Sequence, residues 1–266
     1  MSFGETGSVY QYLLGVRERR GAGFLVLLDP DRASPERIGE QAARCGEAGA
    51  DAVLIGSSLM MGNGFEESVR AVKRAVNLPV IIFPGEKSQV TPEADAILFL
   101  SLLSGRNPEY LIGEQIRSAP LIRRIGIEAI STAYLLVDSG RTTSVEFMSN
   151  TKPLPSDKPD IAVAHAMAAE MFGMKFIYLE AGSGASRPVP DEMVSAVVSE
   201  VRTPVIVGGG IRSPETVAGK VKAGASFVVV GNHLEGHPNV CSAHAGDPAG
   251  SGDYRSLVEL IAAAHR

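Results

Sequence analysis

The sequence predicts an α/β fold, a single (β/α)8 TIM-barrel domain that spans residues 1–266. Eight short runs rich in β-branched residues alternate with longer segments of helical pattern, which is typical of parallel βα units. The chain of 266 residues has the usual length of such a barrel, and its 45% hydrophobic residues can fill a large core. We therefore expect the functional site at the carboxyl ends of the strands, where these barrels carry it.

The expected elements follow one another along the chain. Strands are predicted where short apolar runs stand between turn residues, at 24–28, 52–55, 80–83, 96–100, 129–137, 175–179, 204–207 and 227–230. Helices are predicted at 9–19, 35–48, 66–76, 108–117, 161–172, 191–200, 214–223 and 254–264. Several of them begin at a capping residue followed by proline, as Ser34-Pro35 and Ser213-Pro214 do, which favours a helix start.

Three connections depart from the regular alternation. Residues 84–95 are too few and too broken by proline for a barrel helix, so we expect a loop or a short strand in place of the third helix. Residues 138–158, rich in Ser, Thr, Gly and Pro, are too long for a simple turn and predict a lid or rim over the strand ends. Residues 236–253 predict a surface excursion whose role the sequence does not indicate.

Composition excludes several classes of function. The net charge is −5, and the 25 basic residues are scattered, which argues against a nucleic-acid partner. No apolar segment is long enough for an integral membrane span, and residues 1–6 lack the pattern of a secretory signal, so we expect a cytoplasmic location. Two cysteines, Cys45 and Cys241, exclude a disulfide framework.

Small residues follow three consecutive predicted strands. Tyr178-Leu179-Glu180-Ala181-Gly182-Ser183-Gly184 ends the sixth strand, Gly208-Gly209-Gly210 the seventh and Gly231-Asn232 the eighth. Exposed amides and a helix N-terminus bind phosphate at this place in barrels without needing Lys or Arg. Glycines that merely end strands would explain one such cluster but hardly three in register. The pattern therefore predicts a phosphate site.

Two carboxylates follow the first strand in Leu27-Leu28-Asp29-Pro30-Asp31-Arg32. Magnesium prefers hard oxygen ligands and usually takes one or two carboxylates together with substrate phosphates, a role that suits Asp29. The alternative that Asp-Pro-Asp is only a turn before the next helix stays open. The second strand ends in Ile55-Gly56-Ser57-Ser58, which adds hydroxyls at the same rim.

Glu180 lies directly at the end of an apolar strand. An unpaired carboxylate is costly to bury, so it either pairs with a base or a metal or meets a developing positive charge. The flanking glycines favour a functional role over a structural ion pair.

These patterns together resemble the geranylgeranylglyceryl phosphate synthase family. The resemblance covers residues 23–234 and rests on five stretches: Leu28-Asp29-Pro30-Asp31, Ile55-Gly56-Ser57-Ser58, residues 178–184, Val207-Gly208-Gly209-Gly210-Ile211-Arg212 and Val230-Gly231-Asn232. Residues 136–153 further resemble the second group of that family, shared by some archaea and by bacteria of the Bacteroidetes type.

The resemblance implies a prenyltransferase that joins a long-chain prenyl diphosphate to the 3-hydroxyl of sn-glycerol 1-phosphate and releases diphosphate. Mg2+ would be held by Asp29 and Ser58, and the catalytic residues would be Glu180 and Tyr178. The residues implied in glycerol phosphate binding are Tyr178, Leu179, Glu180, Ala181, Gly182, Ser183, Gly184, Gly209, Gly210, Gly231 and Asn232. Relatives also lack the third barrel helix, and they form dimers or hexamers, so we expect a homo-oligomer.

The prenyl tail requires an apolar groove. We expect it beside the barrel mouth, lined by Leu100, Leu102, Leu103, Ile130 and Tyr134, although each of these side chains could equally belong to the ordinary core. A lipid product also predicts transient contact with a membrane surface. The sequence does not indicate the preferred chain length.

One position departs from the pattern of many relatives, which carry a lysine where this chain has Leu27. The positive charge of that lysine would come from Arg32 or Lys152, or the exposed backbone amides of the phosphate site would suffice without it.

Three alternative functions are weaker. A phosphoribosyl isomerase would share the glycine clusters but needs acids on strands one and five, where the fifth offers Ser131-Thr132. A non-catalytic phosphate- or lipid-binding barrel would not need both a metal site and a buried acid. Zinc held by His233, His237, Cys241 and His244 would require an irregular ligand spacing.

Overall fold

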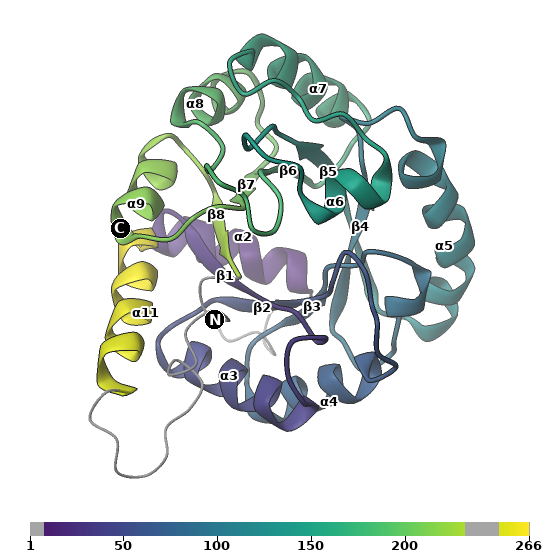
Figure 1. The fold of residues 1–266 in the computed structure, drawn as a ribbon, viewed down its shortest axis with the longest axis vertical. Helices are drawn as coiled ribbons and strands as arrows, with labels where there is room; N and C mark the ends of the chain where they lie inside the picture. Colours follow the sequence, from purple (N-terminus) through teal and green to yellow (C-terminus); the bar gives the residue numbers. More distant parts are fainter. Residues whose placement is uncertain (1–7, 232–249, 266) are drawn as a thin grey trace.

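The computed structural model describes residues 8–231 and 250–265, and its strands form one closed parallel barrel (Figure 1). The strands pair in chain order, and β8 closes the barrel against β1. They are β1 Gly23–Leu28, β2 Ala52–Ile55, β3 Val80–Ile82, β4 Ala96–Ser101, β5 Glu128–Leu136, β6 Phe176–Glu180, β7 Val205–Gly208 and β8 Phe227–Val230. All eight predicted strands are confirmed, each within one residue at either end.

Helices surround the barrel in the expected alternation. They are α2 Val9–Arg20, α3 Pro35–Glu47, α4 Phe65–Ala75, α5 Glu114–Ile125, α6 Ser144–Ser149, α7 Pro159–Met171, α8 Asp191–Glu200, α9 Pro214–Lys222 and α11 Gly250–Ala264. The helix predicted at 108–117 begins as a π-helix, η2 Glu109–Gly113, and continues through α5. The prediction ended it too early, because Pro120 lies inside α5 and the chain leaves the helix only at Gly126, with φ 78°.

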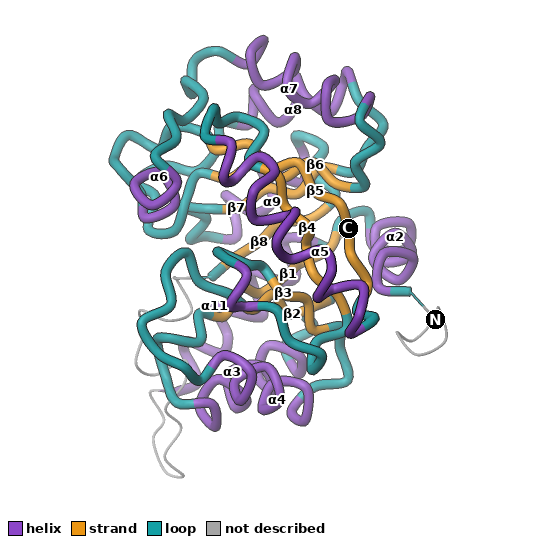
Figure 2. Tube along the Cα trace, turned by 90° about the vertical axis from the view of Figure 1, so that its right-hand side faces the viewer, coloured by secondary structure: helices purple, strands orange, loops and turns teal. Residues whose placement is uncertain are grey.

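The core has two layers because strand side chains alternate between the two faces of the barrel wall. In β1, Phe24 and Val26 belong to the outer layer beneath the helices, whereas Leu25 belongs to the barrel interior. Helix α2 contributes Leu13 and Val16 to the interior layer. It therefore closes the amino-terminal end of the barrel, on the side away from α6 (Figure 2).

Two of the three irregular connections, 84–95 and 138–158, are as the sequence predicts; of the third, residues 236–249 lie outside the described residues and 250–253 belong to α11. Between β3 and β4 the chain makes only the 3-10 turn η1, Lys87–Gln89, so the third barrel helix is absent. Residues 138–158 include α6 and return beside β5 through a bridge between Val137 and Leu154. Among the described residues, no helix has the length and hydropathy that crossing a membrane requires.

Candidate functional site

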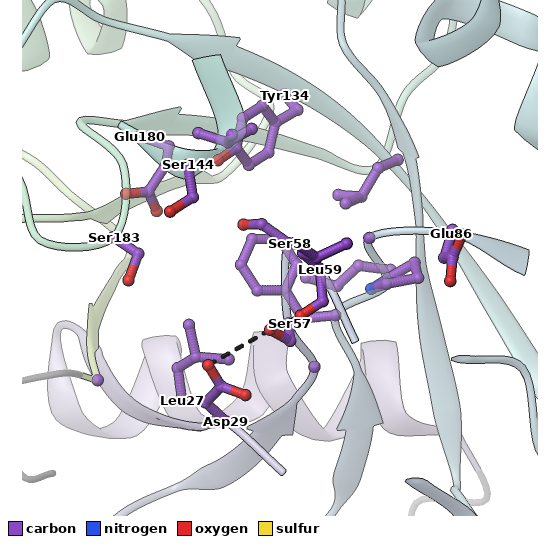
Figure 3. A pocket seen from close by; sticks show the side chains of 18 of the residues that line it. Leu27, Asp29, Ser57, Ser58, Leu59, Glu86, Tyr134, Ser144, Glu180 and Ser183 are labelled. Atoms are coloured by element: carbon purple, nitrogen blue, oxygen red, sulfur yellow. Dashed lines mark hydrogen bonds between the residues drawn. The ribbon is translucent and has the colours of Figure 1, made fainter. Parts of the chain in front are cut away.

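A cavity of about 780 Å³ opens at the carboxyl ends of the strands (Figure 3). Its wall takes residues from the ends of successive strands and from α6, so the barrel mouth and the 138–158 connection enclose it together. Figure 3 shows Glu180 on one side of this space and Asp29 with Ser57 on the other. The two acids that the sequence singles out therefore face one cavity.

Glu180 ends β6 and lines the cavity, although its side chain is only 5% exposed. Its Oε1 accepts the backbone N–H of Gly182 at 2.6 Å. Burial raises the pKa of this carboxyl to about 7, while the Gly182 amide and the nearby Tyr178 hydroxyl oppose the rise. A carboxyl with such a pKa can exchange a proton near neutral pH, as a general base must.

Tyr178 lies beneath Glu180 and is fully buried, so it forms the floor of the site and not part of the cavity wall. Its ring stacks on Phe83 with centroids 5.3 Å apart and packs against Tyr134 at 5.6 Å. Burial raises the Tyr178 pKa well above its usual value, and the Glu180 charge adds to the effect. Within the described residues its hydroxyl has no partner with the geometry of a hydrogen bond.

Glycines at the end of β7, Gly208 in the strand and Gly209 after it, are required by the close approach of Glu180. A Cβ at Gly208 would lie 2.5 Å from the Tyr178 hydroxyl and 2.7 Å from Glu180 Oε2. A Cβ at Gly209 would lie 2.2 Å from Glu180 Oε1, and Gly209 has a φ of 82° that favours glycine. Gly209 and Gly210 also line the cavity, so they serve both packing and the site.

The other predicted phosphate residues fall into three groups. Ser183, Gly184 and Gly231 line the cavity. Leu179, Ala181 and Gly182 are buried behind the wall and shape the strand end without facing the cavity. Asn232 lies outside the described residues, as do His233, His237, Cys241 and His244 of the zinc alternative.

The candidate metal site lies at the ends of β1 and β2. Asp29 Oδ2 accepts the Ser57 hydroxyl at 3.3 Å, and Arg32 Nε lies 3.5 Å from the same oxygen. Ser58, the next residue in the chain after Ser57, also lines the cavity. One carboxylate and two hydroxyls form a set of hard oxygen donors that fits Mg2+. Sequence reasoning named Ser58 as the hydroxyl ligand and missed the direct contact of Ser57 with Asp29.

Arg32 also bears on the missing lysine at Leu27. Both Leu27 and Arg32 line the cavity, whereas Lys152 does not. Of the two predicted sources of positive charge, the structure brings Arg32 to the site.

Asp31, the second acid after β1, holds a loop. Its carboxylate accepts the backbone N–H groups of Met61 at 2.5 Å and Gly62 at 3.1 Å. The turn alternative describes Asp29 instead, because its Oδ1 accepts the backbone N–H of Asp31 at 3.1 Å and its carbonyl accepts that of Arg32 at 3.2 Å. Asp29 therefore makes the turn and also lines the cavity. The supported loop carries exposed Leu59 and Met61 at the edge of the cavity.

An apolar arm of the cavity extends along β4 toward α5. Its wall includes Ile97 and Phe99, which belong to the outer layer of the barrel, and Ile122 of α5. A regular third helix would pack over this outer face. Its absence therefore leaves room for a long hydrocarbon chain.

The predicted groove residues divide between this arm and the core. Leu100, Leu102 and Tyr134 line the cavity, as expected. Leu103 and Ile130 do not, because Ile130 points into the closed barrel interior and Leu103 packs against the outer core.

Comparisons with known proteins agree with this geometry. The model of the PcrB family matches residues 15–244. A geranylgeranylglyceryl phosphate synthase of Chitinophaga pinensis is 47% identical over 227 residues, which cover 85% of this chain and 90% of that protein. The synthase of the archaeon Korarchaeum cryptofilum is 48% identical over 210 residues, covering 79% and 86%.

The chain belongs to the PcrB family. Its similarity to both bacterial and archaeal synthases agrees with the resemblance to the second group. Among solved structures, the chain superimposes with a TM-score of 0.88 on the (S)-3-O-geranylgeranylglyceryl phosphate synthase of Thermoplasma acidophilum in complex with its substrate sn-glycerol-1-phosphate. That structure is 33% identical to this chain, and the match covers 97% of this chain and 98% of the other.

Proposed function

We propose that this PcrB-family protein is a Mg-dependent prenyltransferase of membrane ether-lipid synthesis. It would join C1 of a long-chain prenyl diphosphate, geranylgeranyl or similar, to the C3 hydroxyl of sn-glycerol 1-phosphate. The observation that carries the proposal is the continuity of the cavity, which connects a carboxyl base and a glycine cradle to an apolar arm. One cavity thus offers a polar end for glycerol phosphate and an apolar end for the tail.

The glycine cradle would hold the phosphate of glycerol phosphate. Ser183, Gly184, Gly209, Gly210 and Gly231 line one part of the cavity and present small side chains, so a phosphate can approach their backbones closely. The Thermoplasma relative was solved in complex with sn-glycerol-1-phosphate, which supports glycerol phosphate as a ligand of this cavity.

Glu180 would act as the general base. With a pKa of about 7 the carboxyl is about half ionised at neutral pH, and in its ionised form it accepts the proton of the C3 hydroxyl. The C3 oxygen then bonds to C1 of the prenyl chain while the bond from C1 to the diphosphate oxygen breaks. The products are the ether, diphosphate and protonated Glu180, which releases its proton to water. Tyr178 supports the base from below.

Asp29, Ser58 and Ser57 would hold the metal, with Arg32 beside them as a second positive charge. When bound, Mg2+ would neutralise the departing diphosphate. Arg32 would supply part of the charge that the lysine of many relatives provides at the position of Leu27.

The proposal includes transient contact with a membrane surface. Leu59, Met61 and Met148 line the mouth of the cavity and are nevertheless exposed to solvent. A chain of about 20 carbons gains roughly 0.8 kcal/mol per methylene on leaving water, so substrate and product should stay in the membrane. Contact at this rim would let the tail pass without crossing water. Assembly into a homo-oligomer and a cytoplasmic location complete the proposal.

The test is incubation with Mg2+, radiolabelled sn-glycerol 1-phosphate and a panel of prenyl diphosphates, followed by organic extraction. We expect labelled ether lipid, with its yield dependent on chain length, and none with sn-glycerol 3-phosphate. If no prenyl diphosphate gave an extractable product, the assignment would fail.

A phosphoribosyl isomerase activity is not favoured, because Asp138, the acid that follows β5, does not line the cavity.

A further inference from the structure

The turn that replaces the third barrel helix carries one polar side chain that points into the protein. Gln89, in η1, is 0% exposed. Its Oε1 accepts the backbone N–H of Ser57 at 3.1 Å, and its Nε2 donates to the Ser57 carbonyl at 2.7 Å. One side-chain amide thus satisfies both backbone polar groups of a single residue. Such a two-point contact fixes the position of the Ser57 backbone.

Two glycines allow the loops after β2 and β3 to meet backbone to backbone. A Cβ at Gly56 would lie 1.8 Å from the Phe83 carbonyl oxygen, and a Cβ at Gly85 would lie 2.2 Å from the Ser57 carbonyl oxygen. Neither position tolerates a larger residue without displacement of backbone. The contact between Gln89 and Ser57 therefore belongs to a tightly packed junction between the two loops.

The residue held in this way reaches the candidate metal site. The Ser57 hydroxyl lies 3.3 Å from Asp29 Oδ2 and 3.1 Å from the Leu59 carbonyl oxygen, and Ser58 follows it on the cavity wall. Movement of the Ser57 backbone would change the distances from both hydroxyls to the Asp29 carboxylate. The oxygen donors of the site are thus connected to a side chain that does not itself line the cavity.

We infer that Gln89 is a positioning residue, which holds the Ser57 hydroxyl beside Asp29 and keeps Ser58 on the cavity wall, so that these oxygens can bind a divalent metal with the substrate diphosphate. The inference rests on the proposed function, and it assigns a role to the turn that stands in place of the third helix. Gln89 acts through Ser57 and touches neither substrate nor metal.

The test compares wild-type protein with Gln89→Met, which keeps the length of the side chain and removes both hydrogen bonds. The probe is Mn2+ alone, titrated by electron paramagnetic resonance. We expect the dissociation constant for Mn2+ to rise about tenfold, equivalent to about 1.4 kcal/mol. The Mg2+ concentration for half-maximal activity should rise in parallel, while the KM for glycerol phosphate stays unchanged.

A matched control is Thr91→Val. Thr91 is as deeply buried in the same segment, but its hydroxyl donates to Glu66 at 3.1 Å, on the side of α4 and away from Ser57. Thr91→Val should lower the melting temperature and leave the Mn2+ affinity unchanged. A purely structural role for Gln89 would give the two variants the same behaviour.

An unchanged Mn2+ affinity in folded Gln89→Met would overturn the inference, as would wild-type Mn2+ binding that survives Asp29→Asn. If Gln89→Met does not fold, Gly85→Ala replaces it, because its Cβ displaces the same loop. Weaker Mn2+ binding then supports the inference, and wild-type binding refutes it. Ether formation by the wild-type protein tests the proposed function separately. A failure of the proposed function can therefore be distinguished from a failure of the role inferred for Gln89.

Discussion

Replacement of Glu180 by Gln tests the assignment of the base through both stability and activity. The pKa of the buried carboxyl rises from an ordinary 4.5 to about 7. At about 1.4 kcal/mol for each pKa unit, keeping this carboxylate ionised in the folded protein costs about 3 kcal/mol. Gln keeps the shape and can still accept the Gly182 N–H, but it carries no charge.

The sign of the pH dependence follows from proton binding. Below pH 4.5 the carboxyl is neutral in both the folded and the unfolded protein, so it costs nothing. Between pH 4.5 and 7 the unfolded state ionises while folded Glu180 keeps its proton, so wild-type stability falls as the pH rises. Above pH 7 both states are ionised, and the full cost remains.

The measurement is the free energy of unfolding in denaturant for wild type and Glu180→Gln at pH 5 and pH 8.5. Glu180→Gln should be more stable by about 3 kcal/mol at pH 8.5 and by about 1 kcal/mol or less at pH 5, with ether formation largely lost at pH 8.5, where the wild-type base is ionised. Glu86→Gln, at an exposed carboxyl of the same cavity, is the control and should show no such difference. Equal stabilisation at both pH values would refute the reasoning, and retained activity would refute the role as base.

Three further changes test other parts of the site. Asp29→Asn should abolish Mn2+ binding and reduce ether formation at low Mg2+ by at least about tenfold. If the variant kept wild-type activity at low Mg2+, the metal would have to bind elsewhere. Met61→Ser should weaken sedimentation with phospholipid vesicles severalfold. The control is Met171→Ser, because Met171 is as exposed as Met61 (85% and 84%) but lies at the amino-terminal end of the barrel, and it should have no effect. Equal effects of the two changes would show that the rim does not contact the membrane. Gly209→Ala should abolish activity, because its Cβ would meet the Glu180 carboxyl. The control is Gly126→Ala, which has a similar φ and open space around it and should only lower the stability of the protein, by about 1–2 kcal/mol. Similar activity in both variants would contradict the close packing at Gly209.

Local sequence signals account for most of the fold. Each strand is an apolar run that ends at glycine, proline or a polar residue, so its bounds are visible without tertiary information. Helix α5 was harder, because Pro120 favours an early end while Gly126 marks the true one. The six-residue helix α6 has too few turns for a periodic pattern, so the sequence indicates only an irregular connection there.

The site is predictable where function depends on backbone shape and less so where it depends on packing between distant segments. Glu180 and the glycines after β7 carry their own signal, because an acid among small residues at a strand end is unusual. The fully buried place of Tyr178 depends on its stacking against Phe83, which is 95 positions away in the chain and follows a different strand. The contact of Gln89 with Ser57 likewise depends on how closely two loops approach.

The absence of the third helix has two consequences that belong together. On the outside of the barrel it uncovers Ile97 and Phe99, and the cavity extends there as an apolar arm. On the inside, the short turn brings Gln89 against Ser57 at the candidate metal site. A helix of normal length would cover the first region and would carry the chain away from the second. The same local shortening therefore makes room for the prenyl tail and supports the residues that would hold its diphosphate, so restoring a helix there should damage both ends of prenyl diphosphate binding while leaving the glycerol phosphate cradle in place.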